Sequence, residues 1–148
     1  MPTQTWRQVV MAEWQAAATA VNAALVAAGV APLVEWHTGE PVPLPTGTAP
    51  MVWWQWMRDR VQTDDQALAY GTEVVQIMAV VVVGGTTPAE LMAAEAIYLP
   101  VIIAALEVYP FTHHVTYEGG DRLLEPGGLV SWSPTVWRLE IDRAEGAV

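Results

Sequence analysis

The most densely apolar part of the chain is Glu73–Val83, and it predicts the central strand of the fold. The run contains no glycine or proline, is rich in β-branched side chains, and is apolar on both faces from Ile77 onward. Continuous apolar runs of this kind are typical of strands that are covered on both sides. The pair Gly84 and Gly85 ends the run, because glycine is unfavourable inside a strand.

A capped helix is predicted directly after this strand, from Pro88 to Glu107. Thr87 and Glu90 have the spacing of a capping box, and Pro88 stands at the first helical position, where its missing N–H costs nothing. Pro100 lies inside the helix and removes a backbone hydrogen bond, which predicts a kink or a break beside it. The positions expected to face the core are Leu91, Ala94, Tyr98, Val101, Ile102 and Ala105.

Another amphipathic helix is predicted at Thr5–Ala28. Thr3 or Thr5 can cap its start, and Gly29 can end it. Alanines fill the faces away from the core; they allow close approach of a neighbour such as another subunit, or simply reflect the high helix propensity of alanine. The apolar stripe, with steps of three and four residues, consists of Trp6, Val9, Val10, Trp14, Ala17, Val21, Leu25 and Ala28.

The strand predicted at Met51–Arg60 carries large apolar side chains on both faces, because tryptophans and methionines occupy its odd and its even positions. A two-layer domain buries one face of such a strand. The other face is therefore expected to contact a partner, unless a second internal layer covers it. The candidate oligomer-interface residues are Met51, Trp53, Gln55, Met57, Arg58 and Arg60.

The remaining elements complete the sheet. The segment Val61–Gly71, with Asp64 and Asp65, is expected to be the tip of a long antiparallel hairpin, and a proline-rich extended loop precedes the hairpin. The fold class is therefore α+β: one domain, residues 1–148, in which a mixed, mostly antiparallel sheet with a long hairpin packs against two main helices. Shorter strands are predicted at Leu33–Thr38, Thr112–Tyr117 and Thr135–Arg143, with turns or bulges at Gly119-Gly120 and Pro126-Gly127-Gly128.

Composition removes several classes of function. The 148 residues include no cysteine, which excludes disulfides, thiolate metal sites and cysteine nucleophiles. The net charge is −10 and all six basic residues are arginine, so no basic stripe exists for binding a nucleic-acid backbone. Acidity of this kind keeps a protein soluble, and it also suits a surface that stays near DNA without binding it.

Apolar content points instead to association between copies. The chain is 53% apolar and holds eight tryptophans, more than one small core needs, so some are expected to be covered by other subunits. The longest apolar run, Ala96–Leu106, is shorter than the roughly 20 residues of a membrane span. The N-terminus also lacks the pattern of a signal peptide, so no membrane role is expected.

Candidate chemistry is sparse. His114 and Glu118 share a face of their predicted strand, with His113 beside them and His37 a further candidate, so a metal site or an acid/base pair is conceivable there. Adjacent histidines on a strand point to opposite faces, which argues against one ion bound by both His113 and His114. The turn Gly84–Thr87 before a helix can hold an anion, although a strand-to-helix turn needs such residues anyway.

The order of the elements resembles the tail-terminator, or tail-completion, proteins of long-tailed bacteriophages. The resemblance covers nearly the whole chain as a pattern, without a short diagnostic motif. The matching segments are the helix Thr5–Ala28, Trp36–Pro41 leading into Pro43–Pro45, the strand Glu73–Val83, the helix end Ala104–Glu107 and the closing strand Val136–Ile141.

The resemblance implies a structural virion protein, not an enzyme, without a cofactor. Its copies would form a hexameric ring that caps the tail tube, stops tube polymerisation and offers a docking surface to the head-tail connector proteins. DNA would pass through the ring without specific binding. Two alternatives stay open: a neck or head-completion ring protein of the same virion, and a small metal-dependent or acid/base enzyme using His113, His114 and Glu118.

Overall fold

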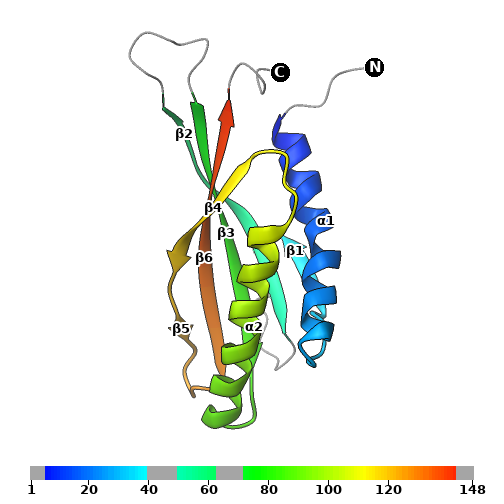
Figure 1. Ribbon diagram of the computed structural model, residues 1–148. Helices are drawn as coiled ribbons and strands as arrows, with labels where there is room; N and C mark the ends of the chain where they lie inside the picture. The colour runs from blue at the N-terminus through cyan, green and yellow to red at the C-terminus, as the bar shows by residue number, and fades with distance from the viewer. Residues whose placement is uncertain (1–5, 40–49, 63–71, 143–148) are drawn as a thin grey trace.

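The structure is a computed structural model that describes residues 6–39, 50–62 and 72–142 (Figure 1). In that part of the chain, two helices lie on one face of a six-stranded sheet. The proline-rich loop, the Asp64-Asp65 turn and the capping residues Thr3 and Thr5 lie outside the described residues. The elements are α1 (Trp6–Ala27), β1 (Glu35–Thr38), β2 (Met51–Gln62), β3 (Thr72–Gly84), α2 (Pro88–Val108), β4 (His114–Gly120), β5 (Leu123–Leu124) and β6 (Val130–Asp142).

The sheet confirms the predicted fold class. Its strand order is β1-β2-β3-β6-β4, with β5 also paired to β6. β1 runs parallel to β2, and the other described pairings are antiparallel. β2 and β3 form the long hairpin: Met51 pairs with Val82 at one end and Gln62 with Thr72 at the other.

β3 is the central strand, and its apolar run is buried on both faces as predicted. Val75, Ile77 and the alternate residues that follow face the helices and belong to the main core. Val80 and Val82 face the opposite side, which we call the open face because neither helix packs on it. On the open face they belong to a smaller buried cluster, formed by Met51, Trp53, Val80, Val82 and Val130.

Trp14 of α1 is the centre of the main core. Its side chain is fully buried, and its ring lies 6.0 Å from that of Trp54, 5.1 Å from Phe111 and 5.9 Å from Trp137. Aromatic pairs at these separations add to the free energy gained from burying their area. The stripe predicted on α1 is the face by which this helix packs on the sheet, except that Ala28 follows the helix and is exposed.

Two contacts fix the helices where their chains turn. The Tyr98 hydroxyl on α2 donates to the backbone oxygen of Ala31, which follows α1, at 2.7 Å. Burial raises the pKa of Tyr98, so its hydroxyl keeps its proton and remains a donor. The Glu13 carboxylate on α1 accepts from the backbone N–H of Thr112 at 2.8 Å and from its hydroxyl at 2.7 Å.

α2 begins as predicted but is not broken. Thr87 is the N-cap, and its hydroxyl accepts from the backbone N–H of Glu90 at 3.2 Å. A kink or a break was expected beside Pro100; the helix continues through Pro100 to Val108, so the break is absent. Pro100 leaves the carbonyl of Ala96 without its helical donor, and both residues are exposed, so water can supply the missing hydrogen bond.

The later strands differ from the prediction at their starts. β4 begins at His114 and not at Thr112, because the backbone N–H of Thr112 is taken by Glu13. β4 then runs to Gly120 through a bulge, where Gly119 has a φ of +106°. The predicted bulge is therefore confirmed, and the turn at Gly127, with a φ of +98°, is confirmed as well.

β6 begins at Val130, five residues earlier than predicted, and includes Pro134. The carbonyl oxygen of Pro134 accepts from the N–H of Asp121 at 3.0 Å. In an extended strand the nitrogen of a residue faces the same side as its carbonyl. The missing N–H of Pro134 therefore points to the gap between β4 and β5, where no partner strand requires it.

Candidate functional site

The face of β2 expected to contact a partner is partly covered within the protein itself. Met51 and Trp53 are only 4% and 5% exposed. Gln55 is half-buried, whereas Met57 is 48% exposed. Arg58 and Arg60 lie on β2, but their side chains are outside the described part of the structure.

Trp53 illustrates why two of these residues are not free to contact a partner. Its ring packs edge-on against Trp132 of β6, with centroids 6.2 Å apart. Trp132 is held in turn by its indole N–H, which donates to the Glu125 carboxylate at 2.8 Å. Met51 and Trp53 are therefore buried by contacts within the protein, without a second layer being shown on this face, and the available part of the β2 face begins at Gln55.

A bulge marks the end of the covered part of β2. The register against β3 shifts between Trp56 and Arg58, which places Met57 in the bulge. Trp56 keeps to the helix side, 6.1 Å from the ring of Trp6. Bulges re-aim side chains, so Met57 projects from the hairpin instead of joining the buried cluster on the open face.

The histidine-containing cluster does not converge on a metal ion in the described residues. The Nε2 atom of His114 lies 3.2 Å from the hydroxyl of Thr116, and Glu118 accepts a hydrogen bond from Gln76 of β3 at 2.8 Å. His113 and His114 line a shallow groove of about 360 Å³ beside the end of α2. Across residues 6–39, 50–62 and 72–142, no three His, Cys, Asp or Glu side chains are placed to hold one ion.

His37 does not join this cluster, contrary to the sequence expectation. It lies on β1, whereas His114 lies on β4, and these two strands are opposite ends of the sheet order. The Nδ1 atom of His37 is 2.8 Å from the carbonyl oxygen of Gly39, and its Nε2 atom is 4.0 Å from Glu35. Its contacts are therefore local to β1.

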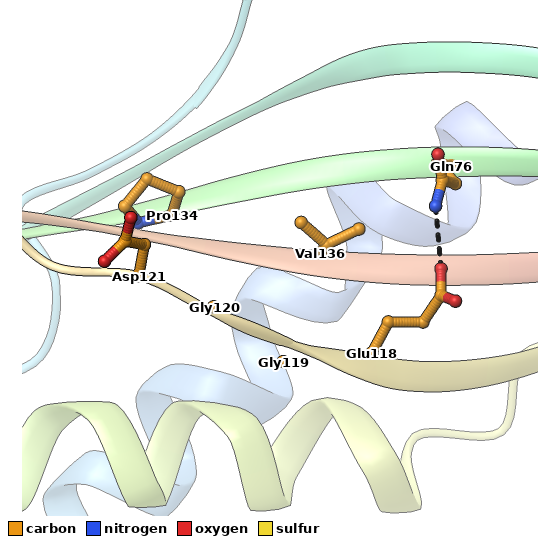
Figure 2. A pocket seen from close by; sticks show the side chains of 7 residues that line it. All are labelled: Gln76, Glu118, Gly119, Gly120, Asp121, Pro134 and Val136. Carbon is orange, nitrogen blue, oxygen red and sulfur yellow. Dashed lines mark hydrogen bonds between the residues drawn. The ribbon is translucent and has the colours of Figure 1, made fainter.

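A second groove, of about 450 Å³, lies on the open face beside the β4 bulge (Figure 2). Glu118 and Asp121 both line it, and Figure 2 shows the hydrogen bond that ties Glu118 to Gln76 across β6. Gly120 allows the close approach, since a Cβ there would stand 2.3 Å from the carbonyl oxygen of Pro134. The two carboxylates are exposed, and the groove has the geometry of a strand bulge rather than of a reactive site.

The helix N-terminus after β3 already has its own anion. The Glu90 carboxylate accepts from the backbone N–H of Thr86 at 2.8 Å and also from the Thr86 hydroxyl. These hydrogen bonds lower the pKa of Glu90. In a standard capping box this carboxylate binds the N–H of Thr87; here the Thr87 backbone also lowers the pKa of Glu90, but less than the two Thr86 donors do. An external anion would have to compete with Glu90 for the same donors.

Sequence reasoning missed the ion pair between Glu95 and Arg122. Glu95 is 8% exposed on the sheet side of α2, and its carboxylate accepts from Nε of Arg122 at 2.5 Å and from a terminal nitrogen at 2.8 Å. The pair raises the pKa of Arg122. It borders an apolar groove of about 400 Å³ on α2, lined also by Met92, Ala96, Leu99 and Pro100. A glutamate at a core-facing helical position was the available signal, because such a residue needs a partner.

No protein-family model matches this chain, and a search of curated proteins found no significant match. The arrangement of the chain's own residues is therefore the guide to its function. In the described part, that arrangement offers shallow grooves, a projecting hairpin and apolar surface. These features are typical of surfaces that bind other proteins.

Proposed function

We propose that this chain is a structural subunit of a virion ring that caps a tail tube, similar to the tail terminators of long-tailed bacteriophages. The observation that carries the proposal is the long β2–β3 hairpin, which continues past the C-terminal end of α2 and bears the exposed side chain of Met57 (Figure 1). The β3 strand of this extension is paired with β6, but α2 does not cover the extension, so part of its surface is open. That part is suited to contact another molecule.

The order of the elements supports the same proposal. Helix, short strand, long hairpin, helix and closing strands follow one another in the order on which the family resemblance was based. The charge is also compatible with the role. A subunit with a net charge of −10 and no lysine repels the DNA backbone, so DNA can cross a ring of such subunits without being held.

A neck or head-completion ring would use similar surfaces, and tube capping is the activity that separates the two functions. The test mixes the purified protein with the tail-tube protein of the same virion and measures tube lengths by negative-stain electron microscopy. We expect ring-shaped caps at tube ends and an arrest of elongation when the protein is present. Unchanged tube lengths and bare ends at saturating protein would contradict the proposal.

The hairpin supplies a matched pair of variants for that assay. Met57→Asp places a charge at the exposed bulge of β2 and is expected to weaken capping, because interface centres exclude charge. Thr116→Asp places the same charge at an exposed position of β4 and serves as the control. If both variants capped tubes like the unmodified protein, the hairpin would not be the tube contact.

A further inference from the structure

The outer face of the two helices carries no charge over most of its length. We define the helix-layer face as the exposed side chains of α1 from Met11 to Val26 and of α2 from Met92 to Ala104. None of these exposed side chains is Asp, Glu, Lys or Arg. The solvent face of a helix in a globular protein is normally charged or strongly polar, so an uncharged face on two neighbouring helices requires an explanation.

The charged residues within these spans are turned away from the helix-layer face or engaged elsewhere. Glu13 is half-buried and binds Thr112, and Glu95 is buried and binds Arg122. The net charge of −10 is therefore carried by other parts of the chain. Large apolar side chains are exposed on this face instead: Met11 at 38%, Val26 at 59%, Met92 at 64% and Ile97 at 39%.

We propose that the helix-layer face is an interface between copies of this chain. The inference deepens the proposed ring, because it assigns a surface to the contact between subunits. It also places that contact away from the β2 residues that the sequence had indicated, two of which are buried within the protein.

The size of the face fits this role. The defined spans of 16 and 13 residues are about 24 Å and 20 Å long at ~1.5 Å per residue. Two packed helices are together about 20 Å wide. The face therefore has a flat projected area of about 500 Å². Its accessible area is larger, because the side chains make the surface uneven. Each partner in the smaller stable interfaces contributes about 600 Å².

The charge of the chain is compatible with a second copy as the occupant. Two molecules that each carry −10 repel one another, so an uncharged surface lets two copies approach at a lower electrostatic cost than a charged surface would. A nucleic acid needs several basic groups, whereas the basic side chain that borders the helix-layer face, Arg122, is paired with Glu95. Both helices are long and apolar enough to cross a membrane, a property that core helices of soluble proteins share. Helices that lie on a membrane surface are bordered by lysine and arginine, whereas this chain has no lysine, and Arg7 packs 4.3 Å from the ring of Trp6.

The test uses charge substitutions on the full chain, with mass measured by light scattering after size exclusion. Ala16→Glu on α1 and Ala93→Glu on α2 replace exposed alanines by another good helix former, so folding should be unaffected. We expect both variants to dissociate to single chains at concentrations where the unmodified protein is fully assembled, an affinity loss of at least about tenfold. Val34→Glu, at a side chain 67% exposed outside both helices, is the control and should keep the assembled mass. Circular dichroism and thermal unfolding verify that each variant is folded.

Assembled mass in both folded helix variants would overturn the inference. A single-chain unmodified protein that instead floats with phosphatidylcholine–phosphatidylglycerol vesicles would overturn it too. Failure of the proposed function is distinguishable from failure of this interface. If the unmodified protein assembles but leaves tubes uncapped, and the helix variants dissociate, the interface is supported and the terminator role is contradicted. If the helix variants remain rings and still cap tubes, the terminator role is supported and the interface is contradicted.

Discussion

A buried hydrogen-bond relay on the helix face of β6 gives the sharpest quantitative prediction. Thr135 is 3% exposed, and its hydroxyl donates to the carbonyl oxygen of Ala79 on β3 at 2.7 Å. The same hydroxyl accepts from the indole N–H of Trp137, which is fully buried, at 2.9 Å. Thr135→Val keeps the volume and β-branching of the side chain but removes both hydrogen bonds.

The expected loss follows from those two bonds. Each buried hydrogen bond contributes about 1 kcal/mol net, and a buried donor left without a partner costs about 1–3 kcal/mol. The carbonyl of Ala79 lies in a strand paired on both sides, so the indole N–H of Trp137 suffers the larger loss. Thr135→Val should therefore destabilise the protein by about 2–4 kcal/mol. For a domain of this size that corresponds to roughly 6–12 °C in Tm.

Ser133→Ala is the matched control, two residues away on the same face of the same strand. Ser133 is 2% exposed, and its hydroxyl has no hydrogen-bond partner within the described part of the chain. Removing it should leave stability within about 1 kcal/mol of the unmodified protein, or slightly above it. Urea unfolding followed by far-ultraviolet circular dichroism measures both variants. Equal losses for the two, or no loss for Thr135→Val, would refute the relay.

The remaining predictions concern the N-terminal end and the middle of α2. Pro100→Ala restores a helical N–H at an exposed position and should stabilise the protein by up to about 3 kcal/mol in thermal unfolding; a lower Tm would show that Pro100 has a packing role. Gly85→Ala should destabilise by about 1–3 kcal/mol in urea, because its Cβ would stand 2.6 Å from the backbone nitrogen of Leu91. Glu90→Gln tests the lowered pKa of Glu90: the stabilising contribution of the carboxylate is complete above its ordinary pKa of 4.5 and is lost as pH falls through the lowered value. The stability gap between Glu90→Gln and the unmodified protein should therefore be largest near neutral pH and close under acid; a gap independent of pH would contradict this.

Regular periodicity made most of the fold predictable. The apolar run that became β3 and the stripe on α1 each follow one strong pattern, and the structure places both elements within one or two residues of their predicted ends. The start of β6 was harder to predict, because Pro134 lies inside the strand and the apolar positions change from even to odd numbers at Val136 and Trp137. Pro134 is tolerated because of the gap between β4 and β5, which sequence periodicity does not encode.

The candidate sites were harder to predict for a related reason. The pairing of Glu95 with Arg122 joins residues 27 positions apart, and only the fold brings them together. The two apolar faces of β2 were visible in the sequence, but whether Trp53 contacts a partner or Trp132 depends on tertiary packing. Likewise, His37 and His114 are separated by the whole width of the sheet, which the order of elements alone did not reveal.

The central claim is that copies of this chain close into a ring, and the mass of the purified protein in solution tests it most directly. Multi-angle light scattering over a range of concentrations should give a discrete species of six 16.1 kDa chains, about 97 kDa, seen as rings in negative stain. A 16.1 kDa species that persists at the highest concentration reached would contradict the account.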